Sequence, residues 1–493
     1  MTSTRSALAV ALLGLVLVGC SAGSPTVDTV GKVTFDTPLA IPPLAESTTD
    51  ATGRHTFALT AQNGTTEFTP GMRTQTSGFD GSYLGPTIVA DRGDDVRIEL
   101  HNALDEPTTV HWHGMHLPAA ADGGPHQLVE PGARWSPEWT VDQPAATLWY
   151  HPHPHGETAN QVGRGLAGMV IVRDEPEAAL PLPRDYGVDD VPVIVQDARF
   201  VDGRLSSESR DYVGVLGDTL LVNGTVGPQF EVTTDVVRLR LLNASPARVY
   251  NFGIDDGRDL ALIGTDGGLL ERPYATPSVQ LSPGERAEVL VRMAAGETAR
   301  LQSRDVGLGG NGLGGANGAA DRFDVLELVA SAALNSVGTV PSELVPMERL
   351  DDLDATAERR FVLDGLQINQ QPMDLTRIDE VVTVDATEVW NVRNNMALPH
   401  SFHVHDVQFQ VLTIGGDPPP PQLDGWKDTI LLHPNTDHRI IMRFTDYTDP
   451  TTPYMYHCHL LQHEDQGMMG QFVVVEPGQR AGTIDPGDTH DQH

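Results

Sequence analysis

Residues 87–100 read TIVADRGDDVRIEL, a stretch in which apolar and polar residues alternate around Gly and Asp. Alternation with a period of two residues is typical of a strand with one buried face, and Gly, Pro, Asn and Asp are typical of turns. Long amphipathic helical stretches are scarce. Similar strand-like stretches recur at 167–172, 236–242, 287–292, 382–392 and 471–475. The sequence therefore predicts an all-β protein of sandwich domains.

The composition excludes several classes of protein. The 493 residues carry 32 Lys and Arg against 67 Asp and Glu, a formal net charge of −35. Nucleic-acid binding needs basic patches, so we expect no nucleic-acid partner. An acidic surface instead concentrates cations. The two cysteines, Cys20 and Cys458, allow at most one disulfide, which excludes a disulfide framework.

The N-terminus has the features of an export signal. Residues 7–18, ALAVALLGLVLV, are apolar but too short to span a bilayer, and they suit the core of a signal peptide. The run ends in LVGC at 17–20, which resembles the cleavage box of bacterial lipoproteins. By that resemblance, residues 1–19 are a lipoprotein signal peptide and Cys20 becomes the lipidated first residue. We expect an exported cell-envelope lipoprotein, held to the outer side of a bacterial membrane through its lipid only.

Two polar, Pro-containing stretches near 174–190 and 335–358 divide the chain into segments of domain size. Residues 20–45, rich in Ser, Thr, Pro and Gly, are predicted to be a tether, and residues 478–493 a flexible tail. The Gly-rich stretch 307–318 matches a dinucleotide-binding pattern but lacks the flanking strand and helix, so we predict a flexible loop. The predicted domains are 46–176, 185–335 and 358–477.

The 19 histidines are unevenly distributed: nine lie at or before His155, ten at or after His400, and none between. A site built from histidines must therefore draw on the first and third domains. Residues i and i+2 of a strand share a face, so each His-x-His step offers two imidazoles to one side. Neutral imidazole suits copper, zinc, iron or nickel. The four clusters with such a step are HWH at 111–113, HPH at 151–153, HSFHVH at 400–405 and HCH at 457–459.

Strand geometry separates a second site from these pairs. Cys458 is expected on the strand face opposite to its neighbours His457 and His459. His400 lies three residues before His403, so it is expected on the face opposite to His403 and His405. We therefore expect Cys458 and His400 to meet behind the strands. The spacing C-x4-H-x4-M after Cys458 adds His463 and Met468. Two histidines, a cysteine thiolate and a weak axial Met are the ligands of blue-copper electron-transfer sites.

Four motifs together resemble the copper-binding motifs of the multicopper oxidase family. They are HWHG at 111–114, WYHPHPHG at 149–156, HSFHVHDVQF at 400–409 and YHCHLLQHEDQGMM at 456–469. The resemblance covers residues 45–476 and is greatest to bacterial copper-tolerance oxidases, which also resemble laccases. It implies three consecutive cupredoxin-like Greek-key β-sandwich or barrel domains, the middle one without copper. It also implies four copper ions per chain: one type 1, one type 2 and a type 3 pair.

The family's ligand roles carry over wherever this sequence matches its motifs, and no ligand position departs from them. The resemblance implies a type 1 copper on His400, Cys458, His463 and Met468. It implies a type 2 copper on His111 and His403. It implies one type 3 copper on His113, His151 and His459, and the other on His153, His405 and His457. Two carboxylates, Asp122 and Glu464, resemble the acidic positions that relay protons in bacterial relatives.

The resemblance implies an oxidase that couples four one-electron oxidations at the type 1 copper to reduction of O2 to water. The acidic, exported chain suits Cu(I) or Fe(II) as the reductant in copper tolerance, and phenols or aromatic amines are the laccase alternative. Residues 340–400 contain only Met347, Met373 and Met396, so the Met-rich insertion of copper-tolerance relatives is missing. A copper-free structural cupredoxin protein lacks such ligands, and a copper nitrite reductase lacks the His-Cys-His bridge. We expect a monomer.

Overall fold

The computed structural model describes residues 26–209, 212–308 and 317–484. The predicted signal peptide, Cys20 and the end of the tail lie outside the described residues, as does most of the Gly-rich loop. No helix in the described ranges combines the length and the apolar character that a membrane span requires.

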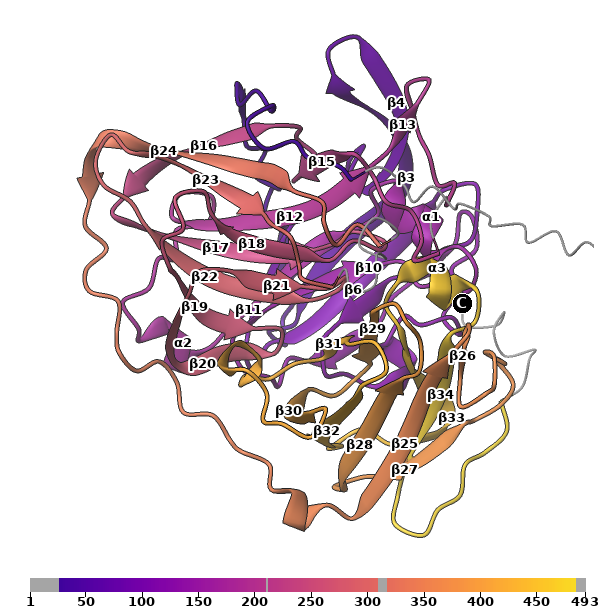
Figure 1. The fold of residues 1–493 in the computed structure, drawn as a ribbon. Coiled ribbons are helices and arrows are strands. Elements are labelled where there is room, and N and C mark those ends of the chain that lie inside the picture. The colour runs from indigo at the N-terminus through magenta and orange to yellow at the C-terminus, as the bar shows by residue number, and fades with distance from the viewer. Residues whose placement is uncertain (1–25, 210–211, 309–316, 485–493) are drawn as a thin grey trace, which may run out of the picture.

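Strands account for nearly all the regular structure of these ranges, and the predicted all-β class is confirmed. Most of the strands belong to six large sheets, two for each predicted domain (Figure 1). The helices among the described residues are short: α1 (Thr158–Gly163), α2 (Glu175–Ala178), α3 (Leu461–Asp465) and the 3-10 turns Ala119–Ala121, Asp352–Asp354 and Pro421–Leu423.

The first sandwich contains the stretch 87–100, which contributes to strands β5 (Ile88–Asp91) and β6 (Asp95–Ala103) on either side of a turn. Buried and exposed residues alternate along β6, as its sequence predicts. One sheet contains β2 (Ser47–Thr49), β3 (His55–Thr69), β4 (Met72–Phe79), β6 (Asp95–Ala103), β8 (Arg134–Trp135) and β9 (Glu138–Thr140). The other contains β5 (Ile88–Asp91), β7 (His111–His113), β10 (Ala146–His151) and β11 (Gly168–Arg173).

The second sandwich has two six-stranded sheets. One contains β12 (Asp190–Ala198), β15 (Thr219–Val222), β17 (Val236–Asn243), β19 (Leu260–Thr265), β20 (Gly268–Thr276) and β22 (Arg286–Arg292). The other contains β1 (Thr37–Pro38), β16 (Pro228–Thr234), β18 (Tyr250–Ile254), β21 (Val279–Leu281), β23 (Thr298–Ser303) and β24 (Phe323–Asn335). A small ribbon pairs β13 (Phe200–Val201) with β14 (Arg204–Leu205).

The described part of the predicted tether is not a free linker. Strand β1 pairs in parallel with β16, and Leu39 is buried in the core of the second sandwich. Ile41 also packs against that core, because its apolar side chain leaves water there. Residues 26–41 therefore lie along the second sandwich, whereas Pro43 and Ala45 form backbone hydrogen bonds with Thr87 of the first.

The third sandwich has two five-stranded sheets. One contains β25 (Ala357–Asp364), β26 (Gln367–Ile368), β28 (Thr387–Asn394), β30 (Phe409–Ile414) and β32 (Asp437–Arg443). The other contains β27 (Glu380–Thr383), β29 (His400–Val404), β31 (Thr429–Leu432), β33 (Asp449–Cys458) and β34 (Met469–Val475).

The histidine-rich strands are paired within their own sheets. In the first sandwich β7 and β10 are antiparallel, with His111 opposite His151. In the third, β29 and β33 are antiparallel, with His403 opposite His457. Each pairing places two His-x-His steps next to each other, and docking of the two sandwiches brings the four steps together.

Candidate metal centre

Eight imidazoles from the four His-x-His steps converge between the first and third sandwiches; we call them the large cluster. The Nε2 atom of His457 lies 3.1 Å from that of His153 and 3.2 Å from that of His405. The members are His111, His113, His151, His153, His403, His405, His457 and His459, each at most 1% exposed.

The other half of the large cluster is as closely packed. The Nε2 atoms of His111 and His403 lie 3.4 Å apart, and His151 Nε2 lies 3.4 Å from His113 Nδ1. The ring of His459 is 5.0 Å from that of His113, and neither of its buried nitrogens has a hydrogen-bond partner. The structure thus brings together all eight predicted histidines.

The large cluster fits metal cations, as the contacts of its outer ring nitrogens show. His405 Nδ1 donates to Asp122 Oδ2 at 2.8 Å, and His457 Nδ1 donates to the carbonyl oxygen of Cys458 at 3.2 Å. Each neutral ring then carries a lone pair on Nε2, and the two lone pairs face each other. A cation between them would replace this repulsion by coordination, with the outer nitrogens held as in other metal sites.

Burial favours the neutral form of four of these rings, those of His151, His153, His403 and His459. Loss of hydration lowers the pKa of His153 and of His459 to about 3. The same cause holds the pKa values of His151 and His403 well below the usual range. Neutral imidazole is the form that binds transition metals.

The second site, the small cluster, lies behind the strands as predicted from residue parity. His400 Nδ1 is 3.4 Å from Cys458 Sγ, and His463 Nδ1 is 3.9 Å from it. The two Nδ1 atoms are 3.3 Å apart. Met468 is fully buried, and its carbonyl oxygen accepts a hydrogen bond from the Cys458 amide at 3.0 Å. Burial raises the pKa of the Cys458 thiol to about 12, so a thiolate here requires a metal ion.

Both predicted carboxylates touch the large cluster. Asp122 is 1% exposed, and its Oδ1 lies 3.3 Å from His111 Nδ1 while its Oδ2 accepts from His405. Glu464 is also 1% exposed, with Oε2 at 3.2 Å from His457 Nδ1 and Oε1 at 3.4 Å from His153 Nδ1. Each carboxylate therefore contacts histidines of both the first and the third sandwich.

The edge of the small cluster is covered. His463 is 1% exposed, and its Nε2 donates to the carbonyl oxygen of Tyr212 at 2.8 Å. The Tyr212 side chain packs edge-on against the His463 ring and is itself 53% exposed. At this edge Tyr212 is exposed to solvent and His463 is not.

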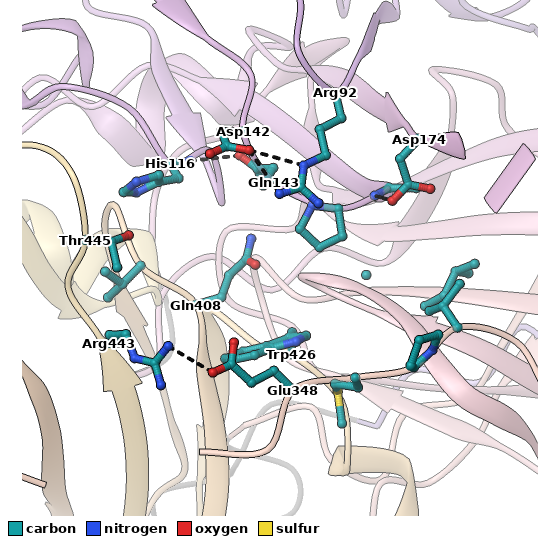
Figure 2. Close-up of a pocket in the computed structure, with 18 of the residues that line it drawn as sticks. Arg92, His116, Asp142, Gln143, Asp174, Glu348, Gln408, Trp426, Arg443 and Thr445 are labelled. Carbon is teal, nitrogen blue, oxygen red and sulfur yellow. Dashed lines mark hydrogen bonds and ion pairs between the residues drawn. The ribbon is translucent and has the colours of Figure 1, made fainter. Parts of the chain in front are cut away.

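A cleft of about 400 Å³ lies where the three sandwiches meet (Figure 2). In it His116 Nδ1 donates to Asp406 Oδ1 at 2.8 Å, and Asp406 directly follows His405. Two ion pairs, Arg92 with Asp142 and Arg443 with Glu348, line its walls. The lining of the cleft includes no member of either cluster, and Asp406 connects it to the large cluster only as the sequence neighbour of His405.

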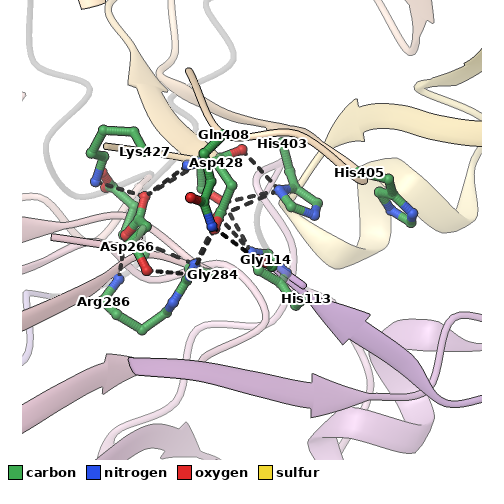
Figure 3. A network of polar contacts seen from close by, with 12 residues as sticks. His113, Gly114, Asp266, Gly284, Arg286, His403, His405, Gln408, Lys427 and Asp428 are labelled. Carbon is green, nitrogen blue, oxygen red and sulfur yellow. Dashed lines mark hydrogen bonds and ion pairs between the residues drawn. The ribbon is translucent and has the colours of Figure 1, made fainter. Parts of the chain in front are cut away.

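Sequence reasoning missed a buried charged network beside the large cluster. His113 Nε2 donates to Asp428 Oδ1 at 3.0 Å, and Arg286 holds the same carboxylate (Figure 3). The predicted strand 287–292 begins one residue after Arg286. The available signal was weak: Asp428 directly precedes an apolar strand, where a charge needs a buried partner.

The comparisons with known proteins agree with this geometry. Family models described as multicopper oxidase match residues 60–177, 201–300 and 344–478. The chain is 36% identical over 444 residues to "Multicopper oxidase mco" of Staphylococcus haemolyticus, covering 89% of this chain and 92% of the relative. It is 39% identical over 453 residues to "Cell division protein FtsP" of Xenorhabdus nematophila, covering 90% and 93%.

Among solved structures, the chain resembles a laccase from Pediococcus acidilactici with a TM-score of 0.83. The two chains are 37% identical, with 90% of this chain and 95% of the laccase covered. This likeness confirms the predicted cupredoxin-like sandwich fold. The chain belongs to the multicopper oxidase family, and it is a laccase-like copper oxidoreductase with O2 as acceptor.

Proposed function

We propose that the protein is a cuprous or ferrous oxidase with four copper ions, which takes part in copper tolerance. Four Cu(I) or Fe(II) ions would each give up one electron, and O2 with four protons would become two water molecules. The observation that carries the proposal is the sequence His457-Cys458-His459, which joins the two clusters. Bound copper supplies the one-electron redox chemistry at both of them.

The two clusters would hold the copper ions as follows. The small cluster would hold type 1 copper through His400, Cys458, His463 and Met468. In the large cluster, His111 and His403 would hold type 2 copper. The type 3 pair would be held by His113, His151 and His459 and by His153, His405 and His457. The close approach of His153, His405 and His457 supports the last grouping.

The chain itself provides the route between the clusters. Cys458 faces the small cluster, while His457 and His459 face the large one, because neighbouring residues of a strand point to opposite faces. Electrons would therefore cross from one site to the other along covalent bonds of adjacent residues.

Water formation also needs protons, and Asp122 and Glu464 would relay them. Both carboxylates are buried against the outer nitrogens of proposed ligands. There each can exchange a proton with water held at the large cluster and fix the orientation of the imidazoles.

The charge of the chain favours a cationic reductant. With a net charge of −35, the surface attracts Cu(I) or Fe(II), whereas it offers no such advantage to neutral phenols. The exposed ring of Tyr212 supports the alternative, a laccase that oxidises phenols or aromatic amines. A copper-free structural role is the remote alternative.

Oxygen uptake by the copper-loaded protein, measured separately with Cu(I) and with a simple phenol as reductant, distinguishes these alternatives. Fast uptake with Cu(I), and phenol oxidation only when copper is added, is the expected result. Fast phenol turnover without added copper would make the protein a laccase. A copper count of zero with full folding would favour the structural role.

We further propose that residues 1–19 direct export and that Cys20 carries the lipid anchor. A Cys20→Ser variant should be absent from the membrane fraction and should keep its oxidase activity. Retention of the variant in the membrane fraction would contradict the anchor.

A further inference from the structure

A buried group of charged side chains joins the middle domain to the large cluster (Figure 3). Five buried charges are costly unless they are paired with good geometry. Three of the five belong to the domain that contains no histidine. The members are Asp266, Glu285, Arg286, Lys427 and Asp428, each at most 2% exposed.

Asp428 is where this group meets the proposed ligands. Its Oδ1 accepts a hydrogen bond from His113 Nε2 at 3.0 Å, and its carbonyl oxygen accepts one from His403 Nδ1 at 2.8 Å. The rings of His113 and His403 are stacked, with centroids 3.7 Å apart and planes inclined by 9°. One residue thus orients two imidazoles that belong to different copper ions in the proposed assignment.

Arg286 fixes the Asp428 carboxylate with both ends of its guanidinium. Nη1 donates to Oδ1 at 2.7 Å and Nη2 to Oδ2 at 2.6 Å, a bidentate pair. Its Nε donates to the carbonyl oxygen of Thr147 on β10 at 2.9 Å. A planar guanidinium sets the orientation of a carboxylate, which a lysine cannot do. The three sandwiches therefore meet at this one side chain.

The rest of the group holds Arg286 and Asp428 in register. Asp266 Oδ1 accepts from the Arg286 amide at 2.7 Å, and its Oδ2 lies 2.9 Å from Lys427 Nζ. Lys427 also donates to Glu285 Oε1 at 2.7 Å. All five groups have charged partners, so the network forms one unit.

The turn before Arg286 lies directly against the ligand rings. A Cβ atom on Gly284 would lie 3.1 Å from carbon atoms of His113 and His459, closer than normal packing allows. Gly284 also has φ +88°, a conformation that favours glycine. The middle domain therefore forms part of the wall of the large cluster.

The same geometry argues against a further metal ion at Asp428. His113, His403 and Asp428 are close enough to be considered as a ligand set. However, Arg286 already places a positive charge on both carboxylate oxygens, and a second cation would be repelled. The nitrogens that face Asp428 are the outer ones, which donate protons rather than coordinate.

We propose that Arg286 and Asp428 are a positioning pair through which the copper-free middle domain orients His113 and His403 for copper binding. This inference rests on the proposed function. It predicts that the pair controls the large cluster and leaves the small cluster unaffected.

Copper-loaded Arg286→Met tests the proposal, with Arg238→Met as the matched control. Arg238 is 1% exposed on β17 of the same domain and pairs with Glu177 and Glu288, without contact to a ligand. Three quantities are measured: the number of copper ions per chain, the electron paramagnetic resonance signal of type 2 copper, and the blue absorption of type 1 copper. Arg286→Met should weaken copper binding at the large cluster about 10- to 100-fold, with a diminished type 2 signal and an intact blue band. Arg286→Lys keeps the positive charge but not the bidentate geometry, so it should restore only part of the type 2 signal.

The control should keep four copper ions and both signals, even if it unfolds as easily as Arg286→Met. Four copper ions and an unaltered type 2 signal in Arg286→Met would overturn the proposal, as would equal copper loss in the control. If Arg286→Met does not fold, Asp428→Asn decides on the same criteria. A wild-type chain without copper would contradict the proposed function as well, so the two failures are distinguishable.

Discussion

The small and large clusters differ in how much of the chain builds them. The residues of the small cluster all lie between His400 and Met468, within the third sandwich. The large cluster takes four imidazoles from the first sandwich and four from the third, and the middle sandwich packs against it. All ligands of the small cluster come from one domain, and the Tyr212 carbonyl of the middle domain contacts only the outer nitrogen of His463. The ligands of the large cluster come together only when the first and third sandwiches dock. Substitutions or copper removal should therefore affect one cluster without affecting the other.

The largest effect is expected from Cys458→Ser. A serine hydroxyl does not provide the soft thiolate of a blue-copper site, so the blue absorption and turnover should be lost. Copper should fall from four ions to three, because the large cluster keeps all its ligands. Copper analysis and the type 2 resonance signal check this. Turnover in the variant would show that electrons enter elsewhere.

Removal of copper by a chelator should have the next largest effect. A ligand that binds only the folded state at a thousandfold excess over its Kd stabilises it by about 4 kcal/mol per site. Metal in the large cluster joins two sandwiches, so its loss should lower the free energy of unfolding and expose interdomain segments to protease. Urea unfolding and limited proteolysis measure both changes. The Cys458→Ser variant is the control: it lacks only the small-cluster ion, and its interdomain segments should stay protected.

Asp122→Ala should affect the large cluster alone. It removes the acceptor of His405 Nδ1 and the contact with His111. Loss of such an outer partner costs about 10- to 100-fold in activity or metal affinity. The control is Asp446→Ala, whose side chain is 61% exposed. An equal loss in both variants, or a weaker blue band in Asp122→Ala, would contradict the separation of the clusters.

The same difference explains what the sequence predicts well. Strand parity alone separates Cys458 and His400 from the His-x-His pairs, because parity is a local property of a strand. All eight predicted imidazoles of the large cluster do converge. The contact between Arg286 and Asp428 joins residues 142 positions apart, and no periodicity encodes it.

Two other features depend on packing between distant segments. The edge of His463 is covered by the carbonyl of Tyr212, a residue 251 positions away in the sequence. The segment 20–45 was predicted to be a tether from its composition. In the described part of this segment, Leu39 is buried in the core of the second sandwich and Ile41 packs against that core. The composition of a segment does not predict which distant surface of the protein the segment will pack against.

The smallest effect should come from His116, which ties the first sandwich to the third beside the large cluster. Its Nε2 lies 3.4 Å from Asp446 Oδ2, its Nδ1 donates to Asp406, and the ring of Tyr447 packs against it. Burial lowers the pKa of His116, but the two carboxylates outweigh it and raise the pKa to about 9.

An unfolded histidine has a pKa of about 6.5, so the folded state binds the proton more tightly. This stabilisation is complete below about pH 6.5 and is lost as the pH rises through about 9. Between about pH 6 and pH 10 the wild type should lose on the order of 1 to 2 kcal/mol more than His116→Gln in urea unfolding. Equal losses of stability in the wild type and in His116→Gln would mean that His116 is not protonated between Asp406 and Asp446. Because His116 contacts neither Cys458 nor its partners, the blue band should not change with this substitution at any pH where the protein is folded.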